Sequence, residues 1–88
     1  MFYYVINMKI KEIYSLISDN IIYYRTNNPK YGYLTYEKLA RLSGINVNLI
    51  KNIESKNKNT VINLNNLNRL ANALDIPLYK LFIKRKVK

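Results

Sequence analysis

The stretch LARLSGINVNLIKNIES, residues 39–55, restricts the fold of this chain more than any other part of the sequence. It places the small residue Ala40 four positions before Gly44, and it has apolar residues at Ile50 and Ile53. Two helices that cross closely over a tight turn need a small side chain at the crossing, a glycine where φ is positive, and apolar anchors one turn apart. We therefore predict two short helices joined by the SGIN sequence, in a helix-turn-helix arrangement.

Apolar periodicity and capping residues predict three more helices. Apolar residues recur at three- and four-residue spacing in the first of these, and leucines do so near residue 70. The sequence TNNPKYGY has an Asn-Pro step, a glycine and no periodicity, so we expect a loop there. In chain order, the expected elements are a helix over Lys9–Arg25, a loop over 26–33, a helix capped by Thr35, a helix over 47–54 capped by Asn46, a helix capped by Asn63, and a last helix with Pro77 in its first turn.

These patterns predict an all-α fold of five helices around one core. In the first helix the apolar stripe begins with Ile10 and Tyr14, and residues 1–7, MFYYVIN, are strand-like but have no partner strand. We expect an N-terminal extension at 1–8, a helical domain at 9–83 and a basic tail at 84–88. The expected core residues are Ile17, Ile21, Leu39, Ala40, Ile50, Ile53, Leu67, Leu70, Ala71, Leu74 and Leu81.

Composition excludes most catalytic chemistry. With 88 residues, of which 49% are hydrophobic, the chain suits one small packed domain. It has no Cys and no His, which removes disulfides, the usual zinc ligands, thiol nucleophiles and the commonest general base. Its five acidic residues are scattered and form no recognisable acid–base pair. We expect neither an enzyme nor a metal or cofactor site.

The net charge of +10 favours a polyanionic partner. No apolar run approaches the roughly 20 residues needed to span a bilayer, and the first residues lack the features of a signal peptide. A basic peptide lying on a membrane surface is an alternative, but an internal glycine turn and five short helices argue against a single amphipathic anchor. We expect a cytoplasmic protein that does not bind membranes.

The two segments LTYEKLARLSGINVNLIKNIES and LNRLANALDIPLYKLF together resemble the lambda-repressor-like domain of the Xre/Cro family. The resemblance covers residues 17–82. It implies that helix 47–54 enters the major groove of double-stranded DNA, that the start of the preceding helix touches the phosphate backbone, and that the loop after helix 47–54 grips the same strand.

Carried over by position, the resemblance implies base contacts from Val47, Asn48, Lys51 and Asn52, and backbone contacts from Tyr36, Asn46, Lys56, Asn57 and Lys58. An asparagine amide matches the N6 and N7 groups of adenine, whereas a lysine can reach a guanine or a phosphate. The other reading is a solvated polar face in an asparagine-rich chain.

Further implications concern Arg25, Glu54 and the turn after residue 54. The resemblance places Arg25 and Glu54 where the family often has a partly buried ion pair; otherwise they are unrelated surface charges. Family members usually have a glycine near Lys56, so we expect Asn57 to adopt the left-handed conformation instead. The loop at 26–33 is longer than usual, and it carries Lys30, Tyr31 and Tyr33 either toward the DNA backbone or toward another protein.

The sequence thus predicts a sequence-specific double-stranded DNA-binding protein that regulates transcription as a repressor. The alternative is an antitoxin or a similar protein-interaction module, in which DNA binding serves autoregulation. The expected partners are DNA and a second copy of the chain, together with a protein partner in the alternative reading.

Overall fold

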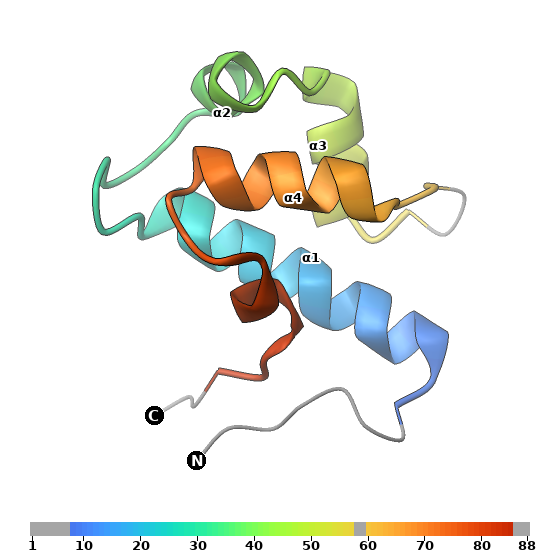
Figure 1. Ribbon diagram of the computed structural model, residues 1–88. Helices are drawn as coiled ribbons and strands as arrows, with labels where there is room; N and C mark the ends of the chain where they lie inside the picture. Colours follow the sequence, from blue (N-terminus) through green and yellow to red (C-terminus); the bar gives the residue numbers. More distant parts are fainter. Residues whose placement is uncertain (1–7, 58–59, 86–88) are drawn as a thin grey trace.

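The computed structural model describes residues 8–57 and 60–85, which form four α-helices and one 3-10 helix. In chain order these are α1 (Ile10–Thr26), α2 (Tyr36–Ser43), α3 (Val47–Glu54), α4 (Leu64–Ala73) and η1 (Leu78–Phe82). In Figure 1, α2 and α3 lie at the top, η1 lies near the bottom, and α4 lies between them. Within the described residues no strand forms; the strand-like sequence at 1–7 lies outside them.

Three of the helices begin at capping residues that the sequence predicted. The side-chain oxygens of Thr35, Asn46 and Asn63 each accept a hydrogen bond from a backbone N–H two or three residues ahead, at 3.1, 2.7 and 2.8 Å. Each bond satisfies one of the N–H groups that have no partner at the start of a helix. Gly44 ends α2 in the left-handed conformation, with φ of 72°. These predicted caps and the predicted turn are confirmed.

The prediction of a fifth α-helix was wrong. The last element is the five-residue 3-10 helix η1. Pro77, expected in its first turn, lies just before it with extended backbone (φ −65°, ψ 146°), and Ile83 returns to extended backbone directly after it. A segment this short between two extended residues suits 3-10 geometry, which proteins use mainly in short pieces.

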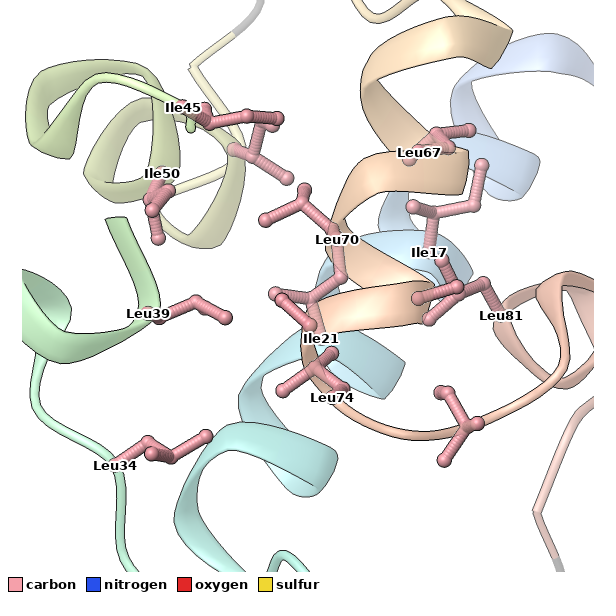
Figure 2. Close-up of a cluster of buried hydrophobic side chains, with 14 residues drawn as sticks. Ile17, Ile21, Leu34, Leu39, Ile45, Ile50, Leu67, Leu70, Leu74 and Leu81 are labelled. Atoms are coloured by element: carbon pink, nitrogen blue, oxygen red, sulfur yellow. The ribbon is translucent and has the colours of Figure 1, made fainter. Parts of the chain in front are cut away.

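The core lies where the helices meet (Figure 2). Every core residue expected from the sequence is buried except Ala40, which is partly buried. The structure adds Leu34, Ile45 and Ile76, which the periodicity of the helices did not include. The apolar stripe expected along α1 includes residues of its first turns that the core does not cover. Ile10 is therefore 63% exposed and Tyr14 is 39% exposed.

Buried polar side chains that the sequence did not predict join the elements. The hydroxyl of Ser18 donates to the carbonyl of Ile53 at 2.6 Å, which links α1 to α3. The amide nitrogen of Asn20 donates to the carbonyls of Leu81 and Ile83, at 2.8 and 3.0 Å. Because these carbonyls come from η1 and the residue after it, Asn20 fixes the C-terminal segment to α1.

Arg85, in the predicted basic tail, also contacts α1. Its Nε donates to Oδ1 of Asn20 at 2.9 Å, and its guanidinium carbon lies 3.8 Å from the centre of the Tyr23 ring. A guanidinium at this distance from an aromatic ring makes a favourable cation–π contact. Residues 84–85, which are the part of the predicted tail that the structure describes, therefore belong to the folded domain.

Candidate nucleic-acid interface

Helix α3 has one buried face and one solvent-exposed face. Ile50 and Ile53 are at most 1% exposed and pack in the core. On the other side lie the four side chains that the sequence predicted as base-contacting; Asn48, Lys51 and Asn52 are exposed and Val47 is partly exposed. In the described part of the chain, the side-chain amides of the two asparagines make no hydrogen bond. Their donors and acceptors are therefore available to a ligand.

The turn before α3 fixes the direction of the helix. The Ser43 hydroxyl donates to the carbonyl of Leu39 at 2.7 Å and accepts from the N–H of Ile45 at 3.2 Å. Ile45 is itself buried, so the chain between α2 and α3 is anchored in the core. Because the positive φ of Gly44 reverses the chain at this point, only three residues separate the end of α2 from the start of α3.

An ion pair between Arg25 and Glu54 holds the end of α3. The Nε and Nη2 groups of Arg25 donate to the two carboxylate oxygens of Glu54, at 2.6 and 2.9 Å. Each side chain is only 6% exposed. The remaining Nη1 group donates to the carbonyl of Leu34 at 2.9 Å. The two residues that the family resemblance paired thus meet in the structure, where they tie α1, the loop before α2 and the end of α3 together.

Tyr36 completes this cluster. Its hydroxyl donates to Oε1 of Glu54 at 3.2 Å, and its ring centre lies 4.2 Å from the guanidinium carbon of Arg25. The negative charge of Glu54 and burial both raise the pKa of Tyr36. The hydrogen bond with Glu54 likewise raises the pKa of Arg25 above its usual value. The phenol therefore stays protonated, and its proton is directed at Glu54, so a phosphate contact would require the hydroxyl to change partner.

Two other candidates for backbone contacts also have partners within the chain. The Asn46 side chain caps α3. The ammonium group of Lys56 lies 2.8 Å from a carboxylate oxygen of Asp19, and both side chains are about half exposed. An exposed pair of this kind contributes at most about 1 kcal/mol and exchanges readily with solvent or another anion. Asn57 is exposed in the loop after α3, and Lys58 lies outside the described residues.

The prediction that Asn57 adopts the left-handed conformation was wrong, because Lys56 adopts it, with φ of 58°. The N–H of Lys56 donates to the carbonyl of Ile53 and the N–H of Asn57 to that of Asn52, both at 3.1 Å. This pair of bonds is the Schellman pattern of helix ends, which requires a positive φ at the first residue beyond the cap. Since Ser55 is the cap, the positive φ falls on Lys56.

Other kinds of site find no support in the described residues. Among them, no group of three or more His, Cys, Asp or Glu residues could hold a metal ion. No helix in the same part of the chain has the length and apolar character needed to cross a membrane.

Comparison with solved structures places the fold among bacterial regulators. The restriction-modification controller protein C.AhdI from Aeromonas hydrophila is 30% identical, with a TM-score of 0.66 over 78% of this chain and 96% of that chain. The hypothetical transcription factor NHTF from Neisseria is 25% identical, with a TM-score of 0.68 over 84% and 79%. SinR from Bacillus subtilis, the master regulator for biofilm formation, is 26% identical in its complex with DNA, with a TM-score of 0.61 over 74% and 95%.

A comparison with curated proteins found no match. The sequence profile of the Cro/C1-type HTH DNA-binding domain, in contrast, matches residues 30–83. This range contains α2, α3, α4 and η1, and it includes both the glycine turn and the exposed face of α3. The chain therefore belongs to the Cro/C1-type HTH DNA-binding domain family.

Proposed function

We propose that this protein binds double-stranded DNA in a sequence-specific manner and represses transcription, with α3 lying in the major groove. The observation that carries the proposal is the contrast between the two sides of α3. Its inner side is fixed by Ile50, Ile53 and the Glu54 ion pair, whereas Asn48 and Asn52 present to solvent amides that bond to none of the described residues. An asparagine amide can pair with the N6 and N7 groups of adenine and contribute about 1 to 3 kcal/mol of discrimination.

The proposed backbone contacts surround α3. Tyr36 would bind a phosphate at the start of α2, and Asn46 would bind one at the start of α3. The loop that contains Lys56, Asn57 and Lys58 would bind phosphates beyond the end of α3. Phosphate contacts fix the register of a protein on the duplex without reading its sequence. The net charge of +10 supports strong attraction to the DNA backbone in general.

We further propose that two copies of the chain bind one operator. Helix-turn-helix proteins commonly bind as dimers to half-sites about one helical turn apart, and the operator then shows two-fold symmetry. Selection of bound sequences from a random duplex pool tests this, together with sedimentation of the selected complex. A site without any repeat, bound by a single copy, would rule out the dimer but not DNA reading by α3.

The test of base reading compares Asn52→Ala with Asn72→Ala, which removes an exposed asparagine from α4. Affinity is measured on the selected duplex and on a scrambled duplex of equal length. Asn52→Ala should weaken binding to the selected duplex by about 1 to 3 kcal/mol and leave the scrambled duplex unchanged. Asn72→Ala should change neither. Equal losses on both duplexes would show that this face does not read bases.

The test of repression uses a promoter that overlaps the selected site. Expression of the wild-type protein should lower transcription of the reporter, and Asn52→Ala should relieve this effect. An increase in transcription on binding would identify an activator instead.

A further inference from the structure

The segment between α1 and α2 is held in place by one buried side chain, Asn28, which is 4% exposed. Its amide nitrogen donates to the carbonyls of Tyr24 and Leu74, at 3.1 and 2.8 Å. Its amide oxygen accepts from the N–H groups of Lys30 and Tyr31, at 2.9 and 3.0 Å. A single asparagine thus fixes the start of this loop to α1 and to the end of α4.

Backbone bonds close the rest of the loop. Asn28 and Gly32 exchange two N–H···O bonds of 2.8 Å, with Gly32 in the left-handed conformation at φ of 71°. Leu34 is 1% exposed, and its N–H donates to the carbonyl of Arg25 at 2.8 Å. Most surface loops are mobile, but these bonds give this one a defined shape before any partner binds.

The loop and the first turn of α2 place two lysines around one aromatic ring. The ammonium nitrogens of Lys30 and Lys38 lie 5.3 and 5.5 Å from the centre of the Tyr31 ring. Within residues 8–57 and 60–85 neither nitrogen has an ion-pair or hydrogen-bond partner. Lys56, in contrast, pairs with Asp19. The cluster therefore places two ammonium groups against one aromatic ring, and no carboxylate of the described residues contacts either of them.

We propose that Lys30, Tyr31 and Lys38, which we call the loop cluster, bind backbone phosphates of the DNA beyond the base pairs that α3 reads. This inference rests on the proposed function and extends the protein's footprint on the duplex. Lys38 lies in the first turn of α2, the part of the helix pair expected beside the backbone, and the ammonium groups of Lys30 and Lys38 both lie near the Tyr31 ring. A phosphate bound at these ammonium groups supplies the Coulombic attraction that no carboxylate of the described residues provides.

The shape of the loop favours this role. Binding usually requires side chains and loops to become ordered, which weakens the affinity. Here the Asn28 bonds already fix the backbone of Lys30, and the Tyr31 ring limits where both ammonium groups can lie. Little further ordering of the backbone is then required when phosphates bind.

The test is Lys30→Ala, with Lys84→Ala as its control. Lys84 is also exposed and comes two residues after η1, which lies at the end of the molecule away from α2 (Figure 1). Each phosphate contact contributes about 0.9 to the slope of log affinity against log salt concentration. Lys30→Ala should reduce this slope by about one unit and weaken selected and scrambled duplexes by the same factor. Lys84→Ala should leave the slope unchanged, and Lys30→Arg should keep the wild-type slope.

Shortening the duplex gives a second readout. Base pairs are removed one at a time from both ends of the selected site, and the affinity is measured for the wild type and Lys30→Ala. The wild type should lose affinity at a longer duplex than the variant does, because only the wild type uses the outer phosphates.

The inference is overturned if Lys30→Ala has the salt slope and duplex-length profile of the wild type. That result would leave an acidic protein surface as the other anionic partner for the loop cluster. Failure of the proposed function looks different, since the wild type itself would then bind selected and scrambled duplexes with equal affinity.

Discussion

The C-terminal turn of α3 and the exposed face of the same helix differ in how their polar groups are satisfied. The Glu54 carboxylate accepts three hydrogen bonds, two from Arg25 and one from Tyr36. The amides of Asn48 and Asn52 make none with the described residues. One region thus stabilises and orients the helix, and the other is available to an external partner. The residues that hold the helix in place are thus different from those proposed to read DNA, although both groups lie within two turns of one helix.

The largest expected effect comes from breaking the ion pair. Glu54→Ala leaves the buried guanidinium of Arg25 without its carboxylate, which should lower the free energy of unfolding by about 3 to 5 kcal/mol. Urea denaturation measures this change. Glu37→Ala, which removes an exposed acid from the first turn of α2, should cost no more than about 1 kcal/mol. Equal losses in the two variants would mean that the Arg25–Glu54 contact does not hold α3.

The exposed face should behave in the opposite way. In the double variant Asn48→Ala and Asn52→Ala, the free energy of unfolding should stay within about 0.5 kcal/mol of the wild type, because both side chains are exposed and neither amide bonds to a described residue. The difference in binding free energy between selected and scrambled duplexes should fall by about 1 to 3 kcal/mol or more. Urea denaturation and binding titrations give the two values. A clear loss of stability would show that these amides support the fold.

Tyr36 contacts both regions, because its hydroxyl donates to Glu54 and its ring centre lies 5.4 Å from the ammonium nitrogen of Lys51 on the exposed face. Tyr36→Phe keeps the ring against Arg25 and removes the hydroxyl that donates to Glu54, which should cost about 1 kcal/mol of unfolding free energy. Tyr79→Phe, at a ring that is 56% exposed, is the control and should cost nothing measurable. Unchanged stability in Tyr36→Phe would show that the hydroxyl does not bond to Glu54 in solution.

The predictability of the fold follows the range of the interactions. Thr35, Asn46, Asn63 and Gly44 act within a few residues of themselves, so the sequence was sufficient to place the caps and the turn. Asn20 bonds to the carbonyl of a residue 61 positions away, and no local pattern indicates such a partner. A buried amide of this kind finds its hydrogen-bond partners only after folding has brought distant carbonyls next to it.

The predictability of the candidate site also depends on the range of the interactions. The periodicity of α3 correctly separated buried Ile50 and Ile53 from the exposed residues beside them. It could not show that Lys56 takes the positive φ, since that depends on which residue caps the helix. Nor could it show that the hydroxyl of Tyr36 bonds to Glu54, a residue 18 positions away. Contacts with bases depend on the DNA as well, so they remain predictions.

The smallest expected effect is the titration of Tyr36. Glu54 and burial raise its pKa above the ordinary value of 10.0, so the folded protein holds this proton more tightly than the unfolded chain does. The resulting stabilisation is fully present below pH 10 and is lost as the pH rises through the pKa of the folded state. Tyr36 is partly exposed, and solvent screening keeps the effect small.

In Glu54→Gln the charge is absent, so the pKa of Tyr36 should move back toward 10. Carbon-13 NMR of the labelled tyrosine ring carbons follows the titration of each tyrosine separately. The midpoint for Tyr36 should be higher in the wild type than in Glu54→Gln. Identical midpoints for Tyr36 would show that its hydroxyl is not coupled to Glu54 in solution, and the boundary between the two regions of α3 would then lie at the ion pair itself.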